Sequence, residues 1–249
     1  RNAPATCPSR PTAALDPAAA RGQCAPMIDI TIIADLICPW CYVGKRNLDM
    51  ALAERSEYPV TIQWQPYQLA PDVPAAGADR AEYMRKHLKS DQQVTAHEDA
   101  VREHGIAAGI NFRFDRIDRV PNTLDAHRLL RWASEHDLSH DMAQRLFEAY
   151  FEEGLDIGDR AVLARLAEDV GLSGEDVASL LATDTDVEPI RAGFQRSRDI
   201  GVRGVPTLIF QSQWAIAGVQ PIESLVAVLD QLQAESVTGY EPPAANDTE

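Results

Sequence analysis

The amino-acid sequence predicts an α/β protein in which a mixed sheet domain is interrupted by an all-helical insertion. Three stretches of hydrophobic spacing lead to this prediction. Alternation typical of strands marks residues 27–34 and 60–64, helical spacing with start and stop signals fills about 79–185, and alternation returns near residue 205. The predicted order of elements along the chain is βαβ, then the helical insertion, then ββα. The predicted boundaries are a flexible tail at 1–26, sheet domain at 27–76, insertion at 77–187, sheet domain at 188–235 and a flexible tail at 236–249.

The N-terminal tail has the composition of a segment that cannot fold alone. Residues 1–26 contain eight Ala and five Pro, and Leu15 is their only large aliphatic residue. They also lack the apolar core of a secretory signal. The first methionine is Met27, so we expect the native start there.

The first half is predicted from alternation followed by helical spacing. Ile28, Ile30 and Ile32 alternate with polar residues, which is typical of a strand. Helical spacing then continues to Arg55, and a second strand covers 60–64. Residues 67–74 contain two prolines and show no regular spacing of hydrophobic residues. This last stretch is predicted to be a loop that leads into the insertion.

The insertion is predicted from helix start and stop signals as much as from hydrophobic spacing. Capping residues precede its apolar runs and glycines follow them, as expected at helix ends. The first predicted helical segments are 81–88, 91–104 stopped by Gly105, and 123–136. The next carries one apolar face of Met142, Leu146, Tyr150 and Phe151 before Gly154, and it is followed by one capped by Asp159 and closed by Gly171 and one that begins at Ser173.

The second half returns to the sheet. A helix with Pro189 in its first turn is expected to end at Gly201. Residues 205–210 and 214–218 read as a hairpin, and a helix follows from Pro221 to about Leu232.

The composition excludes several classes of function. The 249 residues are 45% hydrophobic and 24% charged, as in ordinary globular proteins. A net charge of −15 repels phosphate and anionic lipid, and no run approaches the ~18 apolar residues of a membrane span. We therefore expect no nucleic-acid partner, no membrane partner and a cytoplasmic location, while the oligomeric state stays open.

Cys38 and Cys41 form the motif that carries chemistry. The sequence Cys38-Pro-Trp-Cys41 falls at the predicted strand-to-helix junction, where free N–H groups and the helix dipole favour a thiolate at the outer position. Cys38 should therefore be the nucleophile, with a pKa below the ordinary ~8.5, and Cys41, one turn in, should be buried. The predicted reaction is thiol–disulfide exchange.

A zinc site is the structural alternative for such a pair. Tetrahedral zinc needs four ligands, and the sequence offers no second Cys-x-x-Cys. Cys7 and Cys24 lie far apart in the predicted tail, and His136 and His140 straddle a helix junction and are interpreted as surface residues. We expect no metal.

Four separated motifs resemble one protein family. They are 38–44 (CPWCYVG), 120–129 (VPNTLDAHRL), 149–158 (AYFEEGLDIG) and 218–221 (GVQP), and together with Gly204-Val-Pro-Thr207 they resemble the FrnE-like branch of the DsbA family. That resemblance implies a thioredoxin-like fold and a protein-disulfide oxidoreductase. It implies no cofactor beyond a redox-active Cys38–Cys41 disulfide, with protein or peptide thiols as partners and glutathione as a possible redox partner.

The resemblance also implies a set of site residues. Cys38 would attack and Cys41 resolve, and Pro39 and Trp40 would tune the sulfurs and the docking surface, although Trp40 could equally pack under the insertion. The Val205–Pro206 bond would be cis beside the cysteines and lead into Thr207. Asn122 and His127 are candidate lining residues, and a core or capping role fits each of them equally.

One position departs from the wider family pattern. The acidic residue often found six positions before the outer cysteine is Ile32 here, so proton transfer from Cys41 must be managed differently. Asp35 is the nearest carboxylate in the sequence. Because a negative charge beside Cys38 would oppose thiolate formation, we expect Asp35 to orient the loop by hydrogen bonding.

Two other functions remain open. Kappa-class glutathione transferases and chromene-carboxylate isomerases resemble the chain over a similar length, but they typically place serine where Cys38 stands. A chaperone-like binding module, whose cleft under the insertion holds unfolded chains, is the non-enzymatic alternative.

Overall fold

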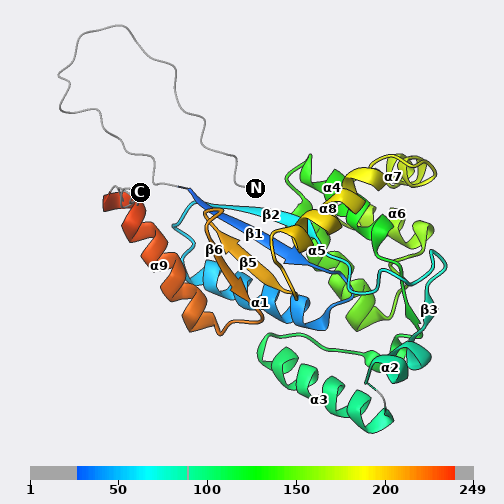
Figure 1. The fold of residues 1–249 in the computed structure, drawn as a ribbon. Helices are drawn as coiled ribbons and strands as arrows, with labels where there is room; N and C mark the ends of the chain where they lie inside the picture. The colour runs from blue at the N-terminus through cyan, green and yellow to red at the C-terminus, as the bar shows by residue number, and fades with distance from the viewer. Residues whose placement is uncertain (1–26, 89, 239–249) are drawn as a thin grey trace, which may run out of the picture.

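A four-stranded sheet forms the centre of the protein (Figure 1). The computed structural model describes residues 27–88 and 90–238; the tail at 1–26 with its two cysteines, and residues 239–249, lie outside this part. The strand order is β2-β1-β5-β6, with β1 parallel to β2 and the other pairs antiparallel. The strands are β1 (Ile28–Ala34), β2 (Val60–Pro66), β5 (Thr207–Phe210) and β6 (Trp214–Ala217).

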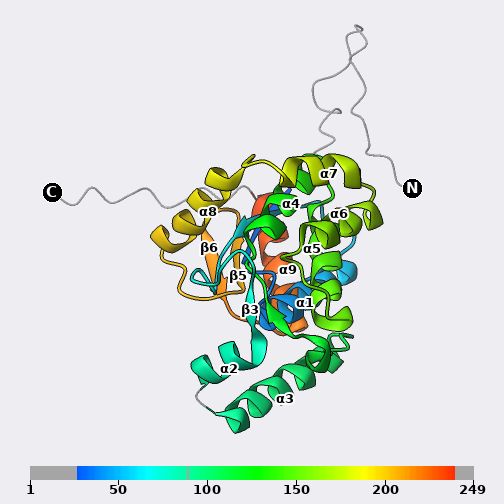
Figure 2. The same cartoon turned by 90° about the vertical axis from the view of Figure 1, so that its right-hand side faces the viewer.

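Helices cover both faces of this sheet. Figure 2 shows α8 on one side and α1 and α9 on the other. These helices are α1 (Pro39–Glu54), α8 (Val187–Asp199) and α9 (Ile222–Thr238). The predicted end of the last helix near Leu232 was too early, because neither glycine nor proline interrupts the chain before Gly239.

The insertion is largely helical, and its start signals act as predicted. The side chains of Asp159 and Ser173 accept hydrogen bonds from the first main-chain N–H groups of the helices that follow them. The helices are α2 (Arg80–Leu88), α3 (Asp91–Ala107), α4 (Leu124–Ser134), α5 (Ser139–Glu148), α6 (Arg160–Asp169) and α7 (Gly174–Leu181), with a 3₁₀ turn at Phe114–Arg116 and a π-helical turn at Ala149–Glu153.

Two details of the insertion differ from the prediction. It also contains a small sheet of β3 (Ala78–Asp79) and β4 (Arg119–Val120), whose two-residue strands are too short to produce an alternating pattern. Gly105 does not stop α3, which continues to Ala107. A Cβ at Gly105 would lie 2.5 Å from Phe112 Cδ2, so glycine here permits close packing.

The insertion and the sheet domain share one hydrophobic core. Tyr42 on α1 stacks on Phe147 of α5, with ring centroids 5.2 Å apart, and lies against Phe151 and Phe112. Because these rings bridge the two parts, the insertion is held over the start of α1. Helices α2 and α3 project from the rest of the chain at that end (Figures 1 and 2). No helix in the described ranges is long and apolar enough to cross a membrane.

Candidate functional site

The two cysteines lie where β1 gives way to α1. Cys38 is the N-cap of α1, with extended backbone, and Pro39 opens the helix. The carbonyl oxygen of Cys38 accepts the N–H of Cys41 at 3.0 Å, so the second thiol lies one turn inside. Both are free thiols, and their exposed fractions are 4% for Cys38 and 1% for Cys41. The site therefore has one thiol at the rim and one behind it.

The environment of Cys41 favours its protonated form. Burial raises the pKa of the Cys41 thiol well above its ordinary value, and a hydrogen bond with Cys38 and the charge of Cys38 act in the same direction. A main-chain hydrogen bond at Asp35 acts the other way. Cys41 thus keeps its proton until a base removes it, while the thiolate character of Cys38 stays a prediction.

The loop before β5 lies directly opposite Cys38. The Val205–Pro206 peptide bond is cis, and Cys38 Sγ lies 3.7 Å from the carbonyl oxygen of Val205. Thr207 fixes this loop because its hydroxyl donates to the carbonyl oxygen of Gly204 at 2.8 Å. The Pro206 ring packs so closely on α1 that a Cβ at Gly44 would lie 3.0 Å from Pro206 Cγ. The structure thus brings Val205, Pro206 and Thr207 to the cysteine pair.

Two cavities lie near the cysteine pair. The larger one, of about 580 Å³, is lined by Trp40, Asn47, His104, Val205, Pro206 and Val219 among others. A smaller one, of about 150 Å³, lies near Pro39 and is lined by Ile37, Leu69, His97 and Tyr150 among others. Open surface is therefore available beside Trp40 and beside Pro39.

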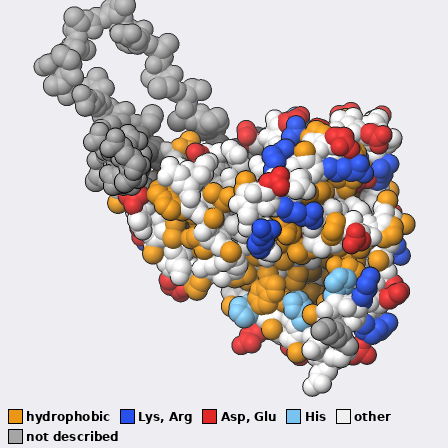
Figure 3. Space-filling model, viewed as in Figure 1, with side chains coloured by type: hydrophobic (Ala, Val, Ile, Leu, Met, Phe, Trp, Pro, Cys, Tyr) orange, Lys and Arg blue, Asp and Glu red, His pale blue; other side chains and the backbone are white. Residues whose placement is uncertain are grey.

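Two histidines of α3 frame Trp40, and sequence reasoning missed them. The ring of His104 meets Trp40 edge-on with centroids 5.0 Å apart, and His97 does so at 6.5 Å. Their spacing of seven residues puts both on one helix face, which is the signal that the sequence offered. Figure 3 shows a broad hydrophobic area above α3, with histidine atoms at its edge.

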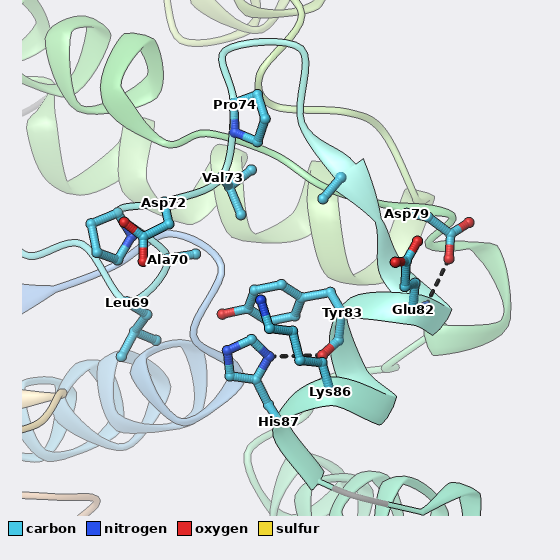
Figure 4. A pocket seen from close by; sticks show the side chains of 12 residues that line it. Leu69, Ala70, Asp72, Val73, Pro74, Asp79, Glu82, Tyr83, Lys86 and His87 are labelled. Atoms are coloured by element: carbon cyan, nitrogen blue, oxygen red, sulfur yellow. Dashed lines mark hydrogen bonds between the residues drawn. The ribbon is translucent and has the colours of Figure 1, made fainter.

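A third cavity, of about 260 Å³, lies between the 69–74 loop and α2 (Figure 4). The rings of Tyr83 and His87 stack there with centroids 4.0 Å apart, and His87 Nδ1 lies 2.7 Å from the carbonyl oxygen of Tyr83. Lys86 and Asp72 also line it. This cavity shares Leu69 and Tyr83 with the one near Pro39, so the two cavities adjoin each other.

Asn122 and His127 take the core and capping roles. The Asn122 amide donates to the Val73 carbonyl oxygen at 2.8 Å, and its oxygen accepts the N–H of Leu124 at 3.0 Å. His127 is 3% exposed, and its Nε2 lies 3.1 Å from the carbonyl oxygen of Tyr67. Neither lines the two cavities beside Trp40, because these bonds hold both side chains within the fold.

Comparison with known proteins now identifies the family. The model of the DSBA-like thioredoxin domain matches residues 29–230. The chain belongs to this family. Its fold is therefore the DsbA-like thioredoxin fold, as the sequence predicted.

Relatives agree with this assignment. A crystal structure named as a probable DsbA oxidoreductase from Streptomyces coelicolor is 27% identical, with a TM-score of 0.75, over 86% of this chain and 92% of that one. Uncharacterized protein YwbO of Bacillus subtilis is 27% identical over 183 residues, which is 73% of this chain and 86% of YwbO. A structure of the cytosolic disulfide reductase DsbM from Pseudomonas aeruginosa with GSH shares the fold, with a TM-score of 0.56. DsbM is 22% identical, and the match covers 84% of this chain and 98% of DsbM.

In this DsbA-like chain, Asp35 performs the predicted loop contact. Its Oδ2 accepts the main-chain N–H of Leu69 at 2.7 Å, which anchors the loop that follows β2. Asp35 is fully buried, and among the described residues its Oδ1 has no hydrogen-bond partner. The nearest cation-forming group is His127, whose Nε2 lies 3.7 Å from Oδ1.

His140 is not the surface residue that the sequence predicted, although His136 is exposed. His140 lies in the first turn of α5, which packs on β2, so its ring turns inward toward α1. His140 Nε2 lies 2.6 Å from Asp49 Oδ1, and Lys45 Nζ donates to Asp49 Oδ2 at 2.8 Å. Burial would raise the pKa of Asp49, but hydrogen bonds from His140 and Lys45 outweigh it and lower that pKa.

Metal ligands are not gathered in the part of the chain that the structure describes. No three His, Cys, Asp or Glu side chains there lie close enough together to hold a metal ion.

Proposed function

We propose that the protein is a thiol–disulfide oxidoreductase that acts on protein or peptide disulfides and dithiols through Cys38-Pro39-Trp40-Cys41. The observation that carries this proposal is the asymmetry of the pair. Cys38 begins α1 with its sulfur 3.7 Å from the Val205 carbonyl oxygen, and Cys41 is buried one turn behind it. An outer nucleophile and an inner resolving thiol are what two-step exchange requires.

The reaction proceeds through a mixed disulfide. The Cys38 thiolate attacks one sulfur of the substrate disulfide, a Cys38–substrate bond forms, and the other substrate sulfur leaves with the electron pair. Cys41 then loses its proton and attacks Cys38 Sγ, which releases the second substrate sulfur and leaves a Cys38–Cys41 disulfide. The same steps run in reverse when the oxidised protein meets a dithiol.

The surroundings of Cys38 suit an extended peptide. The cavity beside Trp40 is lined by apolar side chains and by Val205, so a substrate can lie along the loop with its sulfur at Cys38. We place the protein in the FrnE-like branch on the motifs at 38–44, 120–129, 149–158 and 218–221.

Further parts of the proposal concern the setting of the reaction. Glutathione is the proposed small redox partner, supported by the structure of DsbM with GSH, and the cysteine pair is the proposed sole redox group. We propose a cytoplasmic location, where such a pair is kept reduced, and neither nucleic acid nor membrane as a partner.

Trapping tests the roles of the two cysteines. Cys41→Ser should accumulate mixed disulfides through Cys38, and Cys38→Ser should accumulate none, because only the outer thiol initiates exchange. Equal trapping by both variants would contradict the assignment. Glutathione conjugation that survives in Cys41→Ser would instead support the transferase alternative, and suppression of aggregation by the double Cys→Ser variant would support the chaperone alternative.

A further inference from the structure

A buried carboxylate lies behind the cysteine pair. Asp35 is 0% exposed, and its Oδ2 accepts the N–H of Leu69 at 2.7 Å. Its Oδ1 makes no hydrogen bond within the described residues. An unpaired polar atom in the interior costs stability, so such an atom in a native fold calls for an explanation.

Cys41 is an immediate neighbour of Asp35. The Cys38 N–H donates to the carbonyl oxygen of Asp35 at 3.0 Å, and the Cys41 N–H donates to that of Cys38 at 3.0 Å. The charge of the Asp35 carboxylate disfavours the Cys41 thiolate. A carboxylate that opposes charge on the thiol is also a group that can receive its proton. Strand β1 offers no buried carboxylate as an alternative, since Asp29 is exposed and the buried residues at the end of the strand are Ile32, Ile33 and Ala34.

His127 connects Asp35 with solvent on the other side. Its Nε2 lies 3.7 Å from Asp35 Oδ1. Its ring also lines a cavity of about 120 Å³ between β2, α4 and α8, which the exposed residues Arg131 and Ser134 border. Asp35, His127 and this cavity therefore connect the interior behind the cysteine pair with solvent, and the cavity shares no lining residue with those near Trp40 and Pro39.

We propose that Asp35 accepts the proton of Cys41 when Cys41 resolves the mixed disulfide, and that His127 passes this proton to solvent. The inference rests on the proposed function and assigns to Asp35 and His127 a step that the cysteines cannot perform alone.

The proton moves from Cys41 Sγ to Asp35 Oδ1, and the electron pair left on sulfur forms the bond to Cys38 Sγ while the substrate sulfur leaves with the pair of the broken bond. With its own proton on Nδ1, His127 then takes the proton from Oδ1 at Nε2 and gives the Nδ1 proton to water. Nε2 lies 3.1 Å from the carbonyl oxygen of Tyr67, so the proton that Nε2 receives can be donated in a hydrogen bond to that oxygen.

Other charged or titratable groups surround this path. The guanidinium of Arg198 lies over the Tyr67 ring and donates to the carbonyl oxygen of Gln68. Burial, and then the charge of Asp35, raise the pKa of Tyr83. The remaining groups are Arg131 and Arg196 at the cavity and Tyr150 of the π-helical turn.

A two-phase assay isolates the step. Reduced protein is mixed with dithiodipyridine in a stopped-flow instrument: the first thiopyridone reports attack by Cys38, and the second reports attack by Cys41. Because thiopyridone leaves without needing a proton, the second phase depends on deprotonation of Cys41. Asp35→Asn keeps an oxygen for the Leu69 N–H, so it should slow only this phase, by at least about tenfold at neutral pH.

The pH profile separates proton transfer from a structural effect. Hydroxide can replace the missing base, so the defect of Asp35→Asn should shrink as pH rises. His127→Gln should slow the second phase in the same pH-dependent way, and provides a second variant if Asp35→Asn does not fold. The matched control is Asp159→Asn, the same change at a carboxylate that accepts main-chain N–H groups but is exposed and caps α6.

The outcomes are distinct. A second phase within twofold of the parent in folded Asp35→Asn, or a defect independent of pH, would overturn the proton path. Loss of the second phase in the unmodified protein, or a first phase that persists in Cys38→Ser, would instead contradict the proposed function.

Discussion

Asp49→Asn tests the charged cluster that ties the cysteine-bearing helix to the insertion. Asp49 joins Lys45 of its own helix to His140 of α5. The Lys45 side chain is 3% exposed, so its ammonium depends on the carboxylate. Replacing that carboxylate with a neutral amide leaves a buried cation without its counter-ion, and we expect the protein to lose stability.

The size of the loss follows from the exposure of the partners. Removing one partner of a fully buried pair costs about 3–5 kcal/mol, while exposed pairs contribute about 0–1 kcal/mol. The side chains of Asp49 and His140 are 22% and 28% exposed, so we expect a loss of about 2–3 kcal/mol. For a chain of this size that lowers the melting temperature by about 5–10 °C.

The pH dependence has a defined sign. The pKa of Asp49 is lowered in the folded state, so its contribution is complete above the unfolded value of about 3.9 and is lost as pH falls through the folded pKa. Burial lowers the pKa of Lys45, so Asp49→Asn should regain stability as alkaline pH removes the Lys45 proton.

Urea unfolding across pH, with Lys45→Met as a second background, checks this reasoning. Because Lys45→Met removes the buried cation, Asp49→Asn should cost less than about 1 kcal/mol in that background. An Asp49→Asn protein within about 0.5 kcal/mol of its parent at neutral pH, or an equal cost in both backgrounds, would refute the role of the cluster.

Two glycine positions give further predictions. Gly44→Ala should slow the first thiopyridone phase severalfold, because the new Cβ would lie 3.0 Å from Pro206 Cγ and press on the proline ring. Gly204→Ala is the control, because its new Cβ meets no described atom within 4 Å and should leave this phase unchanged. Equal rates in the two variants would contradict the role of the Gly44–Pro206 contact. Gly105→Ala should lower the free energy of unfolding in urea by about 1–3 kcal/mol, because the new Cβ clashes with Phe112. This loss should exceed the gain of up to about 1 kcal/mol in helix propensity, and a net gain in stability would contradict the packing argument.

Features with local causes could be predicted from the sequence. The strand at 28–34, the caps at Asp159 and Ser173 and the place of Cys38 at a helix start each depend on residues within a few positions of one another. A hydrogen-bonding role for Asp35 could be predicted from a short polar side chain in a turn, but its partner, Leu69, lies 34 positions away and could not.

The remaining features depend on partners far away in the chain. The position of the half-buried His140 is set by Asp49, 91 positions earlier, and the role of Asn122 by Val73, 49 positions earlier. His97 and His104 matter because α3 comes to lie over Trp40, which helical periodicity alone cannot reveal. Local sequence patterns specify elements, whereas these contacts arise only when the elements pack together.

The near-complete burial of both cysteines has a consequence for steady-state kinetics. A dithiol with so little accessible surface, reached past Trp40 and Val205, cannot be engaged by an electron donor and an electron acceptor simultaneously. The two must take turns, so the enzyme should follow a ping-pong scheme with parallel double-reciprocal lines. Each co-substrate, in excess, should then inhibit by occupying the form of the enzyme that the other one needs.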